Sequence, residues 1–104
     1  MMSDPADLFG VQTQPNGSFK LFGELSFASA SQALKLTAKL FSGPATVVFD
    51  LLEVGRVDSA GVALLLEWRR VANEQGVALD FINPPDQLRA IAHVSGVDGI
   101  LGLV

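Results

Sequence analysis

The sequence has no cysteine, no tyrosine and a single histidine among its 104 residues, which leaves few side chains for nucleophilic or metal chemistry. Without cysteine there is no disulfide framework. The glycine patterns that bind phosphate or dinucleotides are also absent. His93 lies three residues before Gly96, where a surface residue at a helix C-terminus is more typical than a general base. We therefore expect a protein that is not an enzyme and needs no cofactor or metal.

Positive charge and long apolar runs are equally scarce. The net charge is −4 and Lys and Arg form no cluster, which argues against nucleic acid or a bare anionic membrane surface as a direct partner. The longest apolar run is well short of the roughly 18 residues that a membrane span requires. The opening MMSDPADLFG does not resemble a secretory signal. We expect a cytoplasmic protein whose partner is another protein.

The first half of the chain predicts a hairpin and a helix. Residues 8–14 and 18–25 alternate in part between apolar and polar side chains, and Pro15-Asn16-Gly17 between them suits a tight turn. Residues 29–41 then place their apolar side chains on one helical face, and Gly43-Pro44 ends that pattern.

The second half predicts strands that alternate with helices. Residues 46–49 form an apolar run typical of a central strand covered on both faces, which should end at Asp50. Residues 52–58 would connect it to a helix over residues 59–75, and residues 77–82 read as another strand.

A third helix should open within Asn83-Pro84-Pro85 and run to Val94, with Leu88, Ile91 and Ala92 inward. The last residues should form a closing segment that packs Ile100 and Leu101. The prediction is one α/β domain over residues 1–104, with residues 1–7 as a flexible N-terminus. Its mixed, mostly parallel sheet would have an N-terminal hairpin and helices packed against it.

The stretch VDSAGVALLLEW at residues 57–68 is the best candidate for a functional site. Ser59 would cap the helix that follows, since a serine hydroxyl can accept a backbone N–H of the first turn and is worth about 1 kcal/mol there. A hydroxyl at the positive end of a helix also suits a phosphate or a polar group of a partner. The two roles are compatible.

The helix over residues 59–75 should have two apolar faces. One face should pack on the sheet and consists of Gly61, Leu64, Leu65, Trp68, Val71 and Ala72. The opposite face is uncovered and would need a partner. We therefore predict a partner interface made of Asp58, Ser59, Ala60, Val62, Ala63, Leu66, Arg70 and Asn73.

The span FDLLEVGRVDSAGVALLLEWRRVANEQG resembles the signature of STAS domains, the fold of bacterial anti-sigma-factor antagonists. In that signature a strand ends in Asp, a seven-residue connection follows, and Asp-Ser/Thr-x-Gly opens a helix. GELSF, GVALLLEW and NPPDQLRAIAHVSGVDGIL are similar to the MlaB-type members, which serve Mla phospholipid-transport ABC systems.

The resemblance implies a non-catalytic subunit that binds and regulates the cytoplasmic ATPase subunit (MlaF-like) beside a membrane permease. It would lie at the inner membrane through that complex, without inserting, and support outer-membrane lipid asymmetry. A hydroxyl at the Ser59 position would lie at the contact. Here serine replaces the threonine familiar in MlaB-type members, and Ala60 replaces glycine or serine. Kinases modify that serine in sporulation-type antagonists, so the alternative is an antagonist that binds an anti-sigma factor kinase and is switched by phosphorylation of Ser59.

Overall fold

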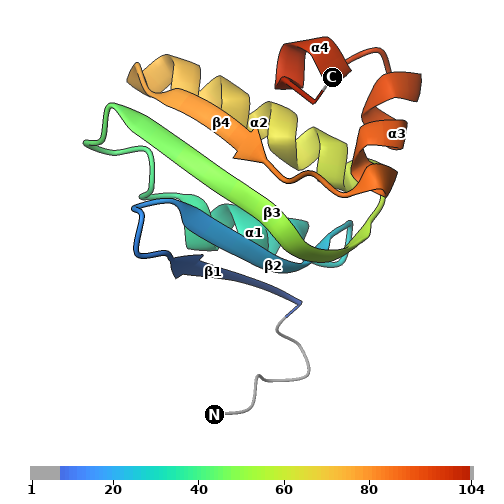
Figure 1. Cartoon of the computed structure of the whole chain (residues 1–104), viewed down its shortest axis with the longest axis horizontal. Helices are drawn as coiled ribbons and strands as arrows, with labels where there is room; N and C mark the ends of the chain where they lie inside the picture. The colour runs from blue at the N-terminus through green and yellow to red at the C-terminus, as the bar shows by residue number, and fades with distance from the viewer. Residues whose placement is uncertain (1–7, 104) are drawn as a thin grey trace.

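A four-stranded sheet in the order β1-β2-β3-β4 forms the frame of the computed structural model, which describes residues 8–103. Figure 1 shows the strands side by side. The hairpin of β1 (Phe9–Thr13) and β2 (Phe19–Leu25) is antiparallel, whereas β3 (Thr46–Val57) and β4 (Ala78–Ile82) continue the sheet in parallel. The predicted mixed α/β fold is confirmed, and the expected flexible segment 1–7 lies outside the described residues.

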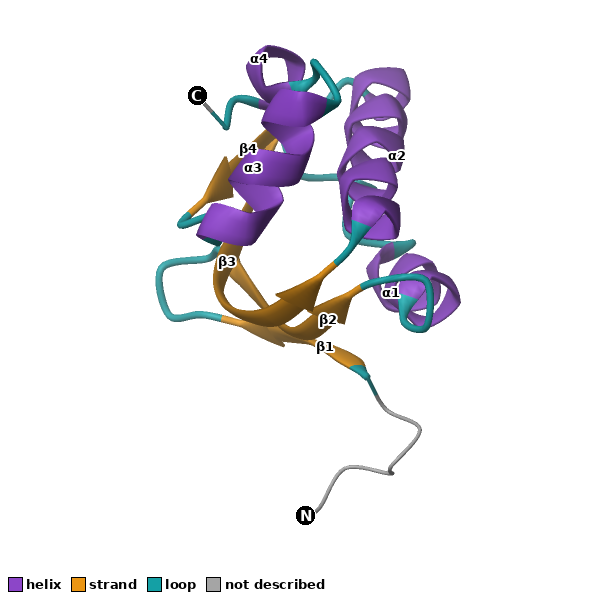
Figure 2. Cartoon of the chain, turned by 90° about the vertical axis from the view of Figure 1, so that its right-hand side faces the viewer, coloured by secondary structure: helices purple, strands orange, loops and turns teal. Residues whose placement is uncertain are grey.

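Within the described residues, four helices accompany the sheet: α1 (Ala30–Thr37), α2 (Ser59–Gln75), α3 (Asp86–Val94) and α4 (Asp98–Leu101). Figure 2 shows α2 alongside the sheet with α1 and α3 on its flanks. The bounds predicted for α2 are confirmed at both ends. Gly76 ends that helix in the left-handed conformation, with a φ of 70° that glycine adopts without strain.

The predicted end of β3 at Asp50 is wrong, because the strand continues to Val57. β4 pairs with β3 only as far as Asp50, and β2 pairs with the remainder through two register irregularities. Because of these irregularities, buried and exposed residues do not alternate regularly along residues 51–57. The sequence of this segment therefore lacks the pattern of a strand and resembles a loop. The prediction that residues 46–49 are covered on both faces is also wrong, since Val48 is only half-buried.

The α1 helix is shorter than predicted and ends at Thr37 rather than near residue 41. Beyond it the chain continues in tighter turns, in which Leu40 N–H donates to the Thr37 carbonyl and Ser42 N–H to the Lys39 carbonyl. Phe41 is nevertheless buried, as its apolar character indicates.

The third helix begins later than predicted, because Pro84 and Pro85 precede it and Pro85 has an extended backbone. Leu88 and Ala92 are buried and Ile91 is half-buried, which confirms the predicted inner face. In the closing segment Leu101 is buried, but Ile100 is 65% exposed, so its predicted packing is wrong. The buried apolar contact at this end of the chain comes instead from Leu103.

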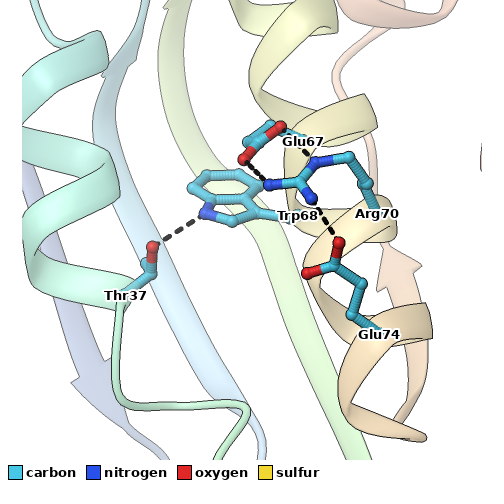
Figure 3. Close-up of polar contacts among 5 residues, drawn as sticks. All are labelled: Thr37, Glu67, Trp68, Arg70 and Glu74. Atoms are coloured by element: carbon cyan, nitrogen blue, oxygen red, sulfur yellow. Dashed lines mark hydrogen bonds and ion pairs between the residues drawn. The ribbon is translucent and has the colours of Figure 1, made fainter.

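The core centres on Trp68 of α2, which is 1% exposed and meets Phe49 of β3 edge-on at 5.1 Å between ring centroids. Its indole N–H donates to Thr37 Oγ1 at 2.7 Å, so α2 is also tied to α1 (Figure 3). The face predicted to pack on the sheet is confirmed, with only Val71 of that face half-buried. At Gly61 an added Cβ would lie 2.5 Å from the Leu25 carbonyl oxygen, so only glycine permits this approach of α2 to β2.

Trp68→Ala should lower the free energy of unfolding by about 3–5 kcal/mol, because it removes the largest buried side chain and leaves a cavity. Thr37→Val should cost less, about 1–3 kcal/mol, since it leaves no cavity and removes the acceptor of the buried indole N–H and the hydroxyl's own hydrogen bond to the Ala33 carbonyl. Urea denaturation measures both. A loss below about 1 kcal/mol for Trp68→Ala would contradict the central position of this ring.

Candidate functional site

The first turn of α2 is capped by Asp58 and not by Ser59 as predicted. Asp58 has an extended backbone, and its Oδ1 accepts the Ala60 N–H at 2.9 Å. Ser59 is therefore the first residue of the helix, and its side chain is exposed. This frees the Ser59 hydroxyl from the capping role while keeping it at the positive end of the helix.

Asp58 also reaches across to the loop that follows β2. Its Oδ2 accepts the Phe27 N–H at 3.2 Å, and its own N–H donates to the Leu25 carbonyl at 3.2 Å. The start of α2 and the end of β2 are thus held together by both backbone and side chain. Asp58 and Ser59 therefore have different roles. The Asp58 carboxylate stabilises the fold, whereas Ser59 is exposed to solvent.

Fewer residues of the predicted partner interface are exposed than expected. Val62 is 5% exposed and Ala60 is 8% exposed, so neither can offer a surface, and Leu66 is half-buried against the core. The physical reason is that α1 and α3 both contact α2, which widens its buried arc beyond the face on the sheet. The predicted members with exposed side chains are Ser59, Ala63, Arg70 and Asn73.

Arg70 forms ion pairs with two glutamates of its own helix. Its guanidinium donates to Glu67 at 2.6 and 2.9 Å and to Glu74 at 2.7 Å, as Figure 3 shows. The hydrogen bond from Arg70 holds the pKa of Glu67 below its ordinary value, and Glu67 in turn raises the pKa of Arg70. Such exposed pairs add little stability. Together they present a charged patch with one excess negative charge.

Asp50 and Asp58 have structural roles in different places. Asp50 Oδ1 accepts from the Leu52 N–H and from the Asn83 side-chain amide, both at 3.0 Å. Within residues 8–103 no group of three or more His, Cys, Asp and Glu side chains could hold a metal ion. No helix in the same part of the chain has the length and apolar character needed to cross a membrane. The site is a surface around the start of α2.

Phe27 was not predicted as a site residue, although it is 77% exposed in the loop between β2 and α1. An aromatic residue just after a strand is normally counted as core. Its position beside α2 depends on the hydrogen bond to Asp58, 31 residues away, which no local pattern reveals.

Comparison with known proteins gives one family match. The family model described as "Mlab, STAS domain" matches residues 9–104. A search of curated proteins finds no match.

Solved structures with the same fold include SpoIIAA, an anti-sigma factor antagonist, in its unphosphorylated form. It is 22% identical with a TM-score of 0.64, and the match covers 92% of this chain and 98% of that one. The Bacillus cell fate determinant SpoIIAA in the phosphorylated form is 24% identical, with a TM-score of 0.63 and coverage of 89% and 86%. An anti-sigma factor antagonist from Mycobacterium paratuberculosis is 20% identical, with a TM-score of 0.65 and coverage of 96% and 87%.

Asp58→Ala should lower the free energy of unfolding by about 1–2 kcal/mol, because it removes the cap of α2. Ser59→Ala should change it by less than about 0.5 kcal/mol, since an exposed first-turn hydroxyl without a capping bond contributes little. Chemical denaturation of the two variants side by side distinguishes them. If Ser59→Ala lowered the free energy of unfolding more than Asp58→Ala, Ser59 and not Asp58 would be the cap of α2.

Proposed function

The chain belongs to the STAS domain family, and from this premise we propose that it is a non-catalytic subunit of an Mla-type phospholipid-transport ABC system. In this role it binds the cytoplasmic ATPase subunit, regulates it, and is held at the inner membrane through the complex with the permease. The observation that carries the proposal is the match of the Mlab STAS model to residues 9–104, nearly the whole described chain. The resulting lipid transport would support outer-membrane lipid asymmetry.

The surface around the start of α2 supports binding without catalysis. Ser59 and Ala63 are exposed and small, so a partner surface can approach the helix closely. Asp58 has its carboxylate oxygens occupied within the domain and requires no cation from a partner. The Glu67, Arg70 and Glu74 patch lies further along the same helix, at the rim of such a contact.

A second candidate function is a partner-switching antagonist that binds an anti-sigma factor kinase. The exposed Ser59 hydroxyl on the first residue of α2 favours it, because a kinase can reach this side chain. The fold shared with SpoIIAA in unphosphorylated and phosphorylated forms supports it as well. A phosphate here would add about −1.5 to −2 charges beside Asp58.

We expect Ser59→Asp to fold normally and to fail to co-purify with the ATPase subunit of the transporter. Helix N-termini tolerate negative charge, but at a buried contact the added carboxylate must be desolvated beside Asp58, at a cost of several kcal/mol. Ser59→Thr should behave like the wild type. Ala63→Glu should also abolish the complex, whereas Leu66 is unsuitable for this test because its half-buried side chain also supports folding.

Co-expression with the ATPase subunit, followed by complex recovery and thermal denaturation, measures these effects. Gln87→Glu is the matched control, because it adds the same negative charge at an exposed residue in the first turn of another helix, α3. A stable complex that carries Asp at position 59 would remove Ser59 from the contact. A wild-type protein that ignores the ATPase subunit, binds an anti-sigma factor kinase and is phosphorylated on Ser59 would establish the second function instead.

A further inference from the structure

Phe27 is an exposed aromatic side chain on a loop that is otherwise firmly held. Its neighbours Ser26 and Ser29 are 2% and 0% exposed. Ser29 Oγ donates to the Glu24 carbonyl at 2.7 Å and accepts the Ser26 N–H at 3.0 Å. The loop therefore buries its serines, which are polar, and leaves the phenylalanine 77% exposed.

The same loop is fixed to the start of α2. Asp58 Oδ2 accepts the Phe27 N–H at 3.2 Å while Oδ1 of the same carboxylate caps α2. The contact of Gly61 with the Leu25 carbonyl keeps β2 and α2 close at this point. The Phe27 backbone is thus bonded to Asp58, the residue directly before Ser59 in the proposed partner surface.

The charge pattern around Phe27 matches that of a protein interface. Residues 25–34 contain no charged side chain, and Ser59 and Ala63 of α2 are uncharged too. The two carboxylates beside them, Asp58 and Glu24, accept hydrogen bonds from the Phe27 N–H and from Ser26 Oγ within the domain. The charged residues Glu67, Arg70 and Glu74 follow further along the helix. A centre that holds an aromatic residue and few charges, bordered by a charged rim, is the usual anatomy of a specific protein contact.

We propose that Phe27 is the apolar anchor of the partner surface and that Asp58 is its positioning residue. The inference rests on the proposed function. It specifies which chemical groups the ATPase subunit needs where it contacts this domain. The subunit presents an apolar pocket that receives the Phe27 ring, and a basic residue next to it meets the net negative rim. Because the loop is already ordered, little conformational entropy is lost when the ring is buried.

Phe27→Ala should weaken binding to the ATPase subunit at least about tenfold, the usual effect of removing an aromatic anchor. Its folding should be unaffected, because the side chain is exposed in the free protein. Phe27→Leu should retain most of the affinity. Val94→Ala is the matched control, since Val94 is an 87% exposed apolar residue at the end of α3 and its removal should leave binding unchanged.

Asp58→Asn tests the positioning role. Asparagine still caps a helix through its oxygen, but its amide group cannot accept the Phe27 N–H. The variant should stay folded, exchange the Phe27 amide proton faster and bind the ATPase subunit more weakly. In a Phe27→Ala background the same substitution should have no further effect on binding, because the two residues act through one contact.

Isothermal titration of the ATPase subunit with each variant gives the affinities. Wild-type affinity of Phe27→Ala, beside a lost complex for Ser59→Asp, would overturn this inference and leave the proposed function standing. Additive losses for Asp58→Asn and Phe27→Ala would overturn the positioning role. A wild-type protein that does not bind the ATPase subunit would overturn the proposed function and, with it, the anchor.

Discussion

The carboxylate of Asp58 is the interaction on which the candidate site depends. One oxygen accepts the Ala60 N–H in the first turn of α2, and the other accepts the Phe27 N–H in the loop after β2. Two chain segments 31 residues apart are joined in this way at one edge of the domain. Gly61 makes the junction possible, because any side chain there would collide with the Leu25 carbonyl. The loop after β2 and the first turn of α2 are consequently held side by side.

Behind this junction lies a core in which residues far apart in the sequence contact one another. Trp68 meets Phe49 of β3 and donates to Thr37 of α1, so the helix that carries Ser59 is fixed against both the sheet and a neighbouring helix. A helix held on several sides moves little as a unit, and its first turn can present side chains in a defined geometry. The stability of the core and the shape of the partner surface therefore have a common origin in the packing of α2.

Much of the architecture could be predicted from the sequence because its signals are local. The Asn-Gly turn, the helical period of residues 59–75 and the glycine at position 76 fix the hairpin and α2 directly. The length of β3 could not be predicted, since its second half follows the irregular register of β2 and not its own alternation. The exposure of the predicted interface residues was correct only in part: Ser59 and Ala63 are exposed, but Val62 is covered by packing that depends on where α1 and α3 lie.

The central claim is that the surface at the start of α2 meets an ABC ATPase subunit. Its most direct test is a photoreactive amino acid placed at position 63 in living cells, with the same residue at position 94 as a control. Position 63 is exposed and uncharged, so the probe disturbs neither the core nor the Asp58 junction. Irradiation followed by mass spectrometry should identify a covalent adduct between position 63 and the ATPase subunit, absent from position 94. An adduct of position 63 with an anti-sigma factor kinase, and none with the ATPase subunit, would contradict the account.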